Sequence, residues 1–391
     1  MVDFQLSDEQ KAMRKLAHDF ALREIRPVAP HYDETEEIPW DVIKKAAALG
    51  ITSYRFPAEY GGGGIDDPVT AYLVGEELAW GCAGIATAIN STGLAAAAIS
   101  NLGTEAQKKK YIGLFCDLSQ VRLGAMALTE PNAGSDVSAL QTTARREGDE
   151  YVLNGTKCFI TNGGIADLHV VFATTDRSMG WKGLAAFIVE KGTPGLSMGK
   201  KEKKMGTRAS HTAEVVLDNC RVTVENRLGG EPGTPGATSG AQGALKMLET
   251  TRPAVGAAAV GIARAAYEYA LDYAKQRIQF GRPIIAYQGI SFKLADMAMA
   301  IDAARLLVWR AGWMAARGIP FERAEGSMAK CFAGDVAVKV TLDAIQIMGG
   351  YGYMRDYPVE KWARDAKIYQ IWEGTAEIQR LIISRALAGG R

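Results

Sequence analysis

Tyr151-Val-Leu-Asn-Gly-Thr156 combines alternating apolar residues with an Asn-Gly pair, which is typical of an antiparallel strand near a hairpin turn. Three more short runs of β-branched or alternating residues follow, at 168–173, 184–189 and 214–217. This texture begins near Val121, and the residues on both sides of it show helical spacing. The sequence therefore predicts a mainly α protein with an antiparallel β domain in the middle of the chain.

Helical spacing dominates the residues before this β domain. Ser7-Asp-Glu-Gln10 has the pattern of a capping box, in which the first and last residues each satisfy a backbone N–H of the other. Further helices are expected at 40–49, 69–79, 85–102 and 105–116. We therefore predict an N-terminal helical domain over residues 1–120.

A connector and a set of long helices follow the β domain, for which we predict residues 121–228. Gly229–Gly243 is rich in Gly, Pro, Thr and Ser, so it predicts a flexible connector. Helical patterns then recur at 244–275, 290–316, 324–348, 359–371 and 375–387. They predict a C-terminal helical bundle, and we assign this third domain to residues 229–391.

The composition excludes several classes of protein. The chain has 391 residues, 48% of them hydrophobic, so it can bury a large core. Its formal net charge of +1 argues against a nucleic-acid-binding protein, which would carry a basic face. The N-terminus lacks the pattern of a signal peptide. The Ala-rich run Ile85–Ile99 is broken by Thr, Asn, Ser and Gly, which favours a buried helix over a membrane span. We expect a cytoplasmic protein with no membrane insertion.

The cysteines are scattered and odd in number, and they never occur as CxxC. A disulfide framework or a zinc site would need pairs at short spacing, so this pattern favours a reducing compartment and predicts no bound metal. The five are Cys82, Cys116, Cys158, Cys220 and Cys331.

Two segments flanking the first strands could hold a flat polar ligand. Ala127-Leu-Thr-Glu-Pro-Asn-Ala-Gly-Ser-Asp136 brings a threonine, a Gly-Ser pair and free backbone N–H groups into one turn. Lys157-Cys-Phe-Ile-Thr-Asn-Gly-Gly164 begins as a strand, with Phe159 and Thr161 expected on the same face. Taken singly, an ordinary surface turn and a strand with one core aromatic are the commoner explanations.

Two further segments are compatible with an anionic ligand. In Lys275-Gln-Arg-Ile-Gln-Phe-Gly-Arg-Pro283, Arg277 lies near a helix end and could pair with a pyrophosphate. In Gln346-Ile-Met-Gly-Gly-Tyr-Gly-Tyr353, the glycines allow the backbone to approach a ligand closely. A solvated arginine and a helix C-cap explain these segments equally well.

The last segment, Ile368-Tyr-Gln-Ile-Trp-Glu-Gly-Thr375, places a glutamate between a tryptophan and a glycine at a break between helices. Apolar neighbours would raise the pKa of Glu373 towards that of a general base. Thr375 is expected to cap the following helix, whose N-terminus is a possible anion site. A helix-terminal glutamate beside a core tryptophan remains an equal alternative for these residues alone.

In their order and spacing, these segments together resemble the acyl-CoA dehydrogenase family over essentially the whole chain. Ala127–Ala139 and Gln346–Asp365 are similar to the two signatures of that family. The similarity continues through Thr251-Arg252-Pro253, Arg277-Ile-Gln-Phe-Gly281 and Ile371-Trp-Glu-Gly-Thr375, and it is closest to the medium- and short-chain straight-chain branch. The resemblance implies an N-terminal helical domain, a barrel-like central β domain and a C-terminal four-helix bundle.

The resemblance also implies FAD as the cofactor. One set of residues would hold the isoalloxazine and ribityl parts within one subunit: Met126, Leu128, Thr129, Gly134, Ser135, Phe159, Ile160 and Thr161. A second set would reach the pyrophosphate and adenine from a neighbouring subunit: Arg277, Gln279, Phe280, Gln288, Gln346, Ile347, Gly349 and Gly350. Thr375 and Glu377 would complete the site.

The reaction that the resemblance implies is the α,β-dehydrogenation of an acyl-CoA thioester to a trans-2-enoyl-CoA, as in the β-oxidation of fatty acids. Glu373 would take the α-proton while the β-hydrogen leaves as hydride to flavin N5. Some branches of the family place the base at the position of Thr251; because a threonine stands there, the base is expected at Glu373. An electron-transfer flavoprotein would accept the electrons, and the enzyme would be a homo-oligomer, most simply a tetramer.

For the substrate, the resemblance aligns the helix from Ile85 to Leu94 with the wall of the acyl cavity. No charged residue occurs from Ala83 to Thr104, which argues against a distal carboxylate on the acyl group. The expected acyl group is therefore of short to medium length, and branched or cyclic groups remain open. The residues expected at the substrate are Ala86, Thr87, Asn90, Leu94, Ser135, Leu248, Glu249, Thr251, Arg252, Trp372 and Gly374.

Two features depart from the family pattern. The connector Gly229–Gly243 is longer and richer in Pro and Gly than expected, and Trp372 stands where a tyrosine is usual. The alternatives to a dehydrogenase are an acyl-CoA oxidase, a flavin-dependent hydroxylase of the same fold, or an inactive CoA- and flavin-binding scaffold. An oxidase is expected to carry a further C-terminal domain, and the hydroxylase and the scaffold are expected to lack Glu373.

Overall fold

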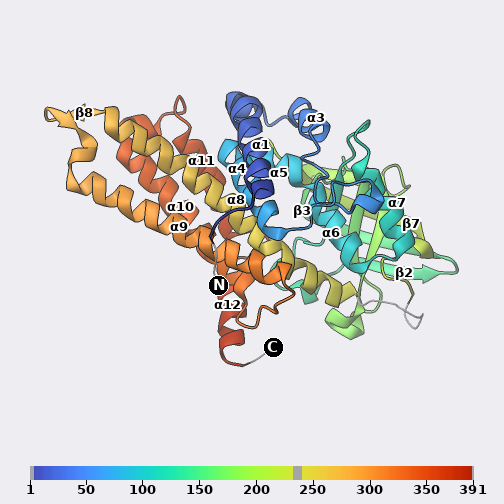
Figure 1. Cartoon of the computed structure of the whole chain (residues 1–391). Helices are drawn as coiled ribbons and strands as arrows, with labels where there is room; N and C mark the ends of the chain where they lie inside the picture. Colours follow the sequence, from blue (N-terminus) through green and yellow to red (C-terminus); the bar gives the residue numbers. More distant parts are fainter. Residues whose placement is uncertain (1–3, 232–239, 390–391) are drawn as a thin grey trace.

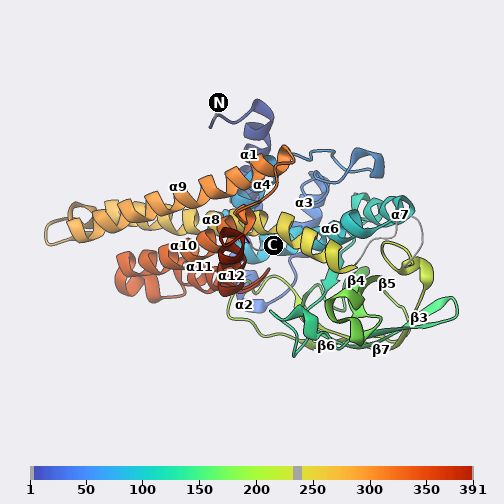
Figure 2. The same ribbon diagram turned by 90° about the horizontal axis from the view of Figure 1, so that it is seen from below.

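The structure is a computed structural model that describes residues 4–231 and 240–389; for 240–248 it describes the backbone only. Its helices gather at both ends of the chain and its main sheet lies between them in sequence (Figures 1 and 2). The sequence prediction of helical N- and C-terminal parts around a central β domain is therefore confirmed.

The N-terminal part is built from seven α-helices. The capping box at the first helix is confirmed, since Ser7 Oγ accepts from the Gln10 amide at 3.1 Å and Gln10 Oε1 accepts from the Ser7 amide at 2.9 Å. A π turn (Ala21–Ile25) and a 3-10 turn (Arg26–Val28) separate the first two helices. The helices are α1 (Asp8–Phe20), α2 (Ala29–Thr35), α3 (Trp40–Ala48), α4 (Pro68–Gly81), α5 (Ala83–Asn90), α6 (Thr92–Leu102) and α7 (Glu105–Cys116).

The single helix expected over 85–102 is wrong, because α5 ends at Asn90 and α6 begins at Thr92. Ser91 lies between them. Its hydroxyl donates to the Ala88 carbonyl at 3.0 Å and accepts from Asn162 Nδ2 at 2.7 Å, which ties this break to the β domain. The stretch Ala83–Leu102 is long and apolar enough to cross a membrane, but 67% of its most apolar window is buried, as in the core helix of a globular protein.

The central sheet has seven strands in the order β1-β4-β2-β3-β7-β6, with β5 paired to β4. The antiparallel prediction holds for β2–β3, β3–β7, β4–β5 and β6–β7 but is wrong for β1–β4 and β2–β4, which pair in parallel. These parallel pairs arise because β4 follows β1 through crossovers and not through a hairpin. The strands are β1 (Gly124–Ala127), β2 (Thr143–Glu147), β3 (Glu150–Thr161), β4 (Leu168–Thr174), β5 (Leu184–Glu190), β6 (Leu196–Lys201) and β7 (Thr212–Thr223).

The Asn154-Gly155 pair is not a hairpin turn. It lies inside β3, where the pairing with β7 shifts register between Leu153 and Gly155. Gly155 has φ +153°, and a Cβ there would lie 2.4 Å from the Thr142 hydroxyl oxygen. The glycine therefore allows a β-bulge in β3 and a close approach to Thr142, just before β2. An Asn-Gly pair in the sequence does not distinguish such a bulge from a hairpin turn.

The C-terminal part consists of long helices that run side by side and end at a small hairpin, β8 (Ile278–Gln279) and β9 (Arg282–Pro283) (Figures 1 and 2). The helix expected over 359–371 is shorter, because a 3-10 turn follows it over Lys367–Gln370. The helices are α8 (Gly240–Gln276), α9 (Gln288–Ala316), α10 (Glu325–Met348), α11 (Val359–Ala366) and α12 (Ala376–Leu387). Of the predicted connector 229–243, residues 232–239 lie outside the described part of the chain.

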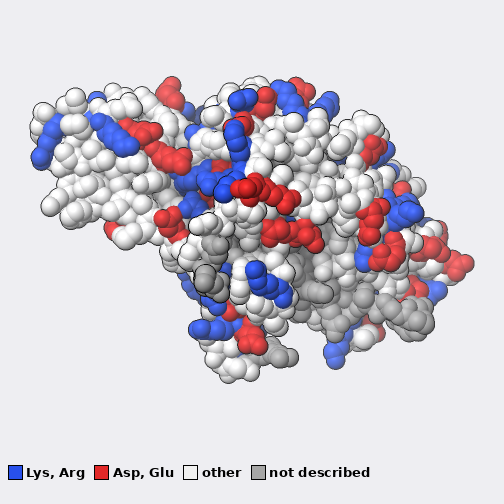
Figure 3. Space-filling model, viewed as in Figure 1, with Lys and Arg blue, Asp and Glu red and all other residues white. Residues whose placement is uncertain are grey.

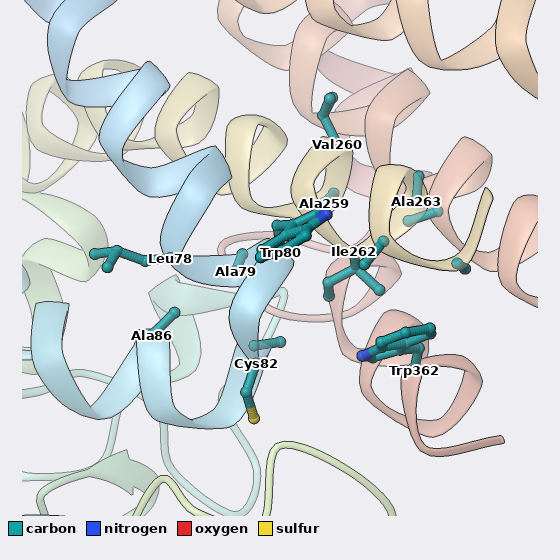
Figure 4. Packing of buried hydrophobic residues seen from close by; sticks show 14 of the residues in the cluster. Leu78, Ala79, Trp80, Cys82, Ala86, Ala259, Val260, Ile262, Ala263 and Trp362 are labelled. Carbon is teal, nitrogen blue, oxygen red and sulfur yellow. The ribbon is translucent and has the colours of Figure 1, made fainter. Parts of the chain in front are cut away.

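Helix α8 packs against α4 at very short range, which fixes the N-terminal helices relative to the bundle. A Cβ on Gly261 would lie 2.2 Å from the Glu76 carbonyl oxygen, so only glycine allows this crossing. Buried side chains of both helices belong to one cluster there, and Trp80 on α4 lies next to Ala259 on α8 (Figure 4). Helices α5 and α11 join the same cluster through Ala86 and Trp362, as does Cys82 between α4 and α5 (Figure 4).

Candidate active site

Glu373 lies in the turn between the 3-10 segment Lys367–Gln370 and α12. Its φ is +55° and that of Gly374 is +89°, so two consecutive residues adopt a left-handed conformation. For a glutamate this conformation costs about 1–3 kcal/mol, and it persists only where surrounding contacts hold it. A Cβ on Gly374 would lie 2.5 Å from Gln379 Nε2, which adds a packing reason for glycine at this position.

Three side chains hold this turn through its backbone. Lys330 Nζ on α10 donates to the Gly374 carbonyl at 2.7 Å. Gln379 Nε2 on α12 donates to the carbonyls of Glu373 and Gly374 at 3.1 and 3.0 Å. Thr375 caps α12 as predicted, since its hydroxyl accepts from the Ile378 amide at 3.3 Å. The turn is therefore fixed from two helices, and its strained conformation is stabilised.

The carboxylate of Glu373 points towards the beginning of α8. Thr251 Oγ1 donates to Glu373 Oε2 at 2.8 Å. Burial raises the pKa of Glu373 above its usual value, and this effect exceeds the opposing effects of the Thr251 hydrogen bond and of the positive charges of Arg252 and Lys330. The direction of the shift agrees with the sequence prediction, and it suits a carboxylate that accepts a proton from carbon near neutral pH.

The two cations beside Glu373 are themselves desolvated. Burial lowers the pKa of Lys330 to about 8, although the Cys331 thiol and the Glu373 carboxylate oppose the shift. Burial also lowers the pKa of Arg252, whose Nη1 donates to the Ser327 hydroxyl at 3.3 Å. Glu249, the other residue predicted on the coenzyme A side, is exposed, and the side chain of Leu248 lies outside the described residues.

The residues predicted for the acyl wall lie in different environments. Ala86 is 5% exposed and belongs to the buried cluster shown in Figure 4. Thr87 is half-buried and its hydroxyl donates to the Ala83 carbonyl at 2.8 Å, while Asn90 is exposed and Leu94 is half-buried. Trp372 packs edge-on against Tyr369 with ring centroids 5.1 Å apart. Its buried indole nitrogen has no hydrogen-bond partner among the described residues.

The two predicted flavin segments lie against each other. The Cys158 amide donates to the Thr129 carbonyl at 2.9 Å, and Lys157 Nζ donates to the Leu128 carbonyl at 3.1 Å. Lys157 also forms a buried ion pair with Glu130 at 2.7 Å. This pair connects the segment that carries Leu128, Thr129, Gly134 and Ser135 with the strand that carries Phe159, Ile160 and Thr161.

The regular strand expected at Phe159 is wrong. The pairing of β3 with β7 shifts register between Lys157 and Ile160, and Phe159 has φ +58°. The bulge leaves Phe159 65% exposed between the buried residues Cys158 and Ile160. An aromatic ring presented in this way is available to stack on a flat ligand.

Most of the second predicted set lines one hollow. A cavity of about 640 Å³ is lined by Arg277, Gln279, Phe280, Ile347, Gly349 and Gly350, among other residues. The Arg277 guanidinium lies 5.4 Å from the Tyr351 ring centre, and Phe280 is 95% exposed. Gln288 and Gln346 are exposed and do not line this hollow.

The two predicted halves of the cofactor site are far apart within one chain. Thr251 lies on α8 and Arg277 directly follows its last residue, Gln276, so the two are 26 residues apart, which corresponds to roughly 40 Å at 1.5 Å per helical residue. The hairpin β8–β9, which follows Arg277, lies at the opposite end of the long C-terminal helices from α12, which follows Glu373 (Figure 1).

Sequence reasoning missed Lys330 and Gln379 and assigned no role to the Glu130–Lys157 pair. Lys330 lies on a buried helix face of small residues, with Ser327 and Gly334 one turn away. A lysine on such a face is unusual and was a detectable signal. Gln379 carried no such signal.

Comparisons with known proteins agree with this architecture. Three family models match, for the N-terminal domain of acyl-CoA dehydrogenase at residues 7–118, its middle domain at 125–220 and its C-terminal domain at 238–388. An acyl-CoA dehydrogenase of Bacillus subtilis (strain 168) is 49% identical over 387 residues, which cover 98% of this chain and 99% of that protein.

Two solved structures are similar over nearly the full length. The butyryl-CoA dehydrogenase of Megasphaera elsdenii has a TM-score of 0.93 and 46% identity, covering 99% of this chain and 100% of that one. A chain in the structure titled electron transferring flavoprotein of Acidaminococcus fermentans has a TM-score of 0.91 and 44% identity, covering 99% of both chains.

Fold and comparisons thus define a flavoprotein oxidoreductase of fatty acid metabolism. The chain belongs to the acyl-CoA dehydrogenase family, and the resemblance derived from its sequence is confirmed.

The cofactor is FAD, and the residues present fit it. The hollow at Arg277 offers a cation for a pyrophosphate, and the space around Gly349 and Gly350 is open enough that a Cβ would meet no atom within 4 Å. Among the residues predicted to hold the isoalloxazine and ribityl parts, Phe159 is exposed near Thr161 in sequence. The space at Gly134 is equally open, since a Cβ there would meet no atom within 4 Å.

Proposed function

We propose that this enzyme dehydrogenates the α,β bond of an acyl-CoA thioester and that Glu373 is the base that removes the α-proton. The observation that carries this proposal is the half-buried Glu373, which is held in a strained turn and whose carboxylate accepts a hydrogen bond from Thr251 at 2.8 Å. Burial raises the pKa of Glu373, which makes it a stronger base than a solvated carboxylate. The product would be a trans-2-enoyl-CoA.

Each of several residues of the chain would have its own role in the reaction. The backbone N–H of Glu373 would donate to the thioester carbonyl and polarise it, which acidifies the α-carbon. Arg252 and Glu249 would contact the coenzyme A side of the substrate. FAD, when bound, accepts the two electrons and the β-hydrogen. Glu373 then carries the α-proton, and the positive charges of Arg252 and Lys330 limit the rise of its pKa.

We infer that the acyl group is of short to medium length and lacks a terminal carboxylate. The helices α5 and α6, which carry the predicted acyl wall, contain no charged residue. An unpaired carboxylate buried against them would cost several kcal/mol. The similarity to a butyryl-CoA dehydrogenase supports a short chain.

We propose that the active site is shared between two copies of the chain, within a tetramer arranged as a dimer of dimers. The roughly 40 Å between Thr251 on α8 and Arg277 just beyond its end supports a second copy as the source of the Arg277 group. The arm formed by the long C-terminal helices α8, α9 and α10 also has an extensive face without charged groups (Figure 3). Its helix α9 exposes large apolar side chains at Phe292, Met299, Leu306 and Trp313, as expected of a surface that another subunit covers.

We further propose an electron-transfer flavoprotein as the acceptor of the electrons, supported by the similarity to a chain in such a flavoprotein's structure. The proposed domains are 1–120, 121–228 and 229–391, and the limits of the three family models support this division.

An anaerobic titration of the purified yellow protein with acyl-CoA thioesters tests the proposed function. Loss of the flavin absorbance on adding butyryl-CoA is expected. Unchanged absorbance with every straight-chain, branched and cyclic thioester would contradict the proposal and would favour an inactive scaffold. Rapid reoxidation of the reduced flavin by air would instead favour an oxidase.

A further inference from the structure

Lys330 is a buried amine whose position the proposed reaction does not explain. It lies on α10, is 1% exposed, and donates to the Gly374 carbonyl at 2.7 Å. Among residues 4–231 and 249–389, no ion pair includes Lys330, Arg252 or Glu373. Burying an ammonium group without a directly paired carboxylate is costly, so its presence here calls for a compensating role.

The charged groups around Lys330 do not neutralise it. On the same helix, Asp335 is engaged elsewhere, because it pairs with Arg380 of α12 and accepts from Gln370 Nε2 at 2.7 Å. From α8, Arg252 adds a second positive charge, and Glu249 is exposed. From α12, Glu377 is also exposed, and Cys331 on α10 is a thiol. Because Asp335 is paired elsewhere and Glu249 and Glu377 are exposed, Glu373 is the half-buried carboxylate of this cluster that remains for Lys330.

We propose that Lys330 is the positioning residue of the catalytic base: it holds the left-handed Glu373–Gly374 turn by its bond to the Gly374 carbonyl and places a positive charge beside the Glu373 carboxylate. The inference rests on the proposed role of Glu373 as the base. The bond fixes where the carboxylate points, and the charge favours the ionised carboxylate that accepts the proton.

These two contributions can be separated by substitution. Lys330→Met removes both the donor and the charge, whereas Lys330→Gln keeps an N–H donor and removes only the charge. Replacing a buried charge with an apolar side chain of similar size is often neutral for stability, so both variants are expected to fold. Lys339→Met, on the exposed side of the same helix, is the matched control.

The experiment measures kcat/KM for butyryl-CoA against pH, together with the rate of flavin reduction in a single turnover. The acid limb of the profile reports ionisation of Glu373, because activity requires its deprotonated form. Without the Lys330 charge the pKa of Glu373 rises further, so the limb moves to higher pH in both variants, by roughly half a unit or more. Comparison on one substrate removes any titration of the substrate itself.

The plateau rate of flavin reduction, at pH values above the acid limb, distinguishes the effect of the hydrogen bond to Gly374 from the effect of the Lys330 charge. It is expected to fall more than tenfold in Lys330→Met and clearly less in Lys330→Gln, with FAD content and melting temperature close to wild type. Lys339→Met should match wild type throughout. Acid limbs and plateaus that coincide with wild type in both variants would overturn the inference, and so would an equal shift in Lys339→Met. Failure of the wild-type enzyme to reduce its flavin would instead overturn the proposed function.

Discussion

The hydroxyl of Thr251 lies 2.8 Å from Oε2 of Glu373 and donates a hydrogen bond to it. This bond joins the beginning of α8 to the turn before α12, two segments 122 residues apart in sequence. A donor to a carboxylate favours its charged form, so Thr251 opposes the desolvation that raises the pKa of Glu373. The pKa of Glu373 is therefore determined by two opposing effects, desolvation and the hydrogen bond from Thr251, and each can be changed separately.

Removing the Thr251 hydroxyl should weaken the enzyme mainly at low pH. In Thr251→Val the pKa of Glu373 rises, so the acid limb of kcat/KM moves to higher pH. A hydrogen bond to a charged group contributes about 1.5 kcal/mol, which corresponds to a loss of roughly tenfold at pH values below the acid limb. Thr251→Ser, which keeps the hydroxyl, should behave like wild type. A Val variant with an unshifted limb would show that the bond does not tune the base.

The Glu130–Lys157 pair should stabilise both the fold and the flavin site. Burial alone would raise the pKa of Glu130, but the charge of Lys157 and the backbone donors outweigh it and hold this pKa below its usual value. The contribution is therefore present above the unfolded pKa of a glutamate and is lost as pH falls through the lowered value.

Lys157→Met leaves the Glu130 carboxylate buried without its partner, so unfolding should become easier by about 3 kcal/mol and FAD affinity should fall. Thermal unfolding at saturating FAD and equilibrium dialysis of the flavin measure the two effects. Lys200→Met removes the partly exposed pair of an exposed lysine with Glu202 and should change both far less. Equal behaviour of the two variants would mean that the buried pair is not important for the site.

Arg277→Ala should lose FAD, because it removes the cation of the hollow near Gly349 and Gly350. Lys275→Ala, two residues earlier in the chain and exposed, is the control.

If the site is shared, an inactive Arg277→Ala chain and an inactive Glu373→Gln chain should complement each other when produced together. Each mixed dimer then has one site with both residues intact. Absence of any recovered activity in isolated mixed oligomers would contradict a shared site.

The substrate series tests the uncharged wall of α5 and α6. Values of kcat/KM should be highest for a straight-chain thioester between butyryl- and octanoyl-CoA and should fall by at least about a hundredfold for glutaryl-CoA, since an unpaired buried carboxylate costs several kcal/mol. Cyclohexanoyl-CoA reports the width of the cavity beside Trp372. A clear preference for glutaryl-CoA would require a cation that enters the pocket from another segment.

How far the sequence predicted the structure depended on the range of the contacts involved. Helix α7 was predicted at its observed bounds from its helical spacing, and the structure shows that its capping box, Thr104 with Gln107, is also local. The break at Ser91 was missed because its partner, Asn162, lies 71 residues away. The bulge at Phe159 depends on the pairing of β3 with β7, which local alternation cannot reveal.

The same distinction applies to the site. The local pattern of Trp372, Gly374 and Thr375 left a structural role for Glu373 equally open, and the resemblance of Ile371-Trp-Glu-Gly-Thr375 to the family decided for the base. Lys330 and Gln379 act on backbone carbonyls across helix packings, and such contacts leave little trace in either segment alone. The length of α8 shows how far the Arg277 group lies from Glu373, because Thr251, which contacts Glu373, is on this helix and Arg277 follows its last residue.

The central claim, that Glu373 is the base, is tested most directly by Glu373→Gln in a single-turnover experiment. Glutamine keeps the shape and a hydrogen-bonding group but cannot accept the α-proton. The variant should retain FAD and bind butyryl-CoA, seen as a perturbed flavin spectrum, while flavin reduction slows by at least about a thousandfold. Flavin reduction by the variant at a rate near wild type would contradict the assignment and place the base elsewhere.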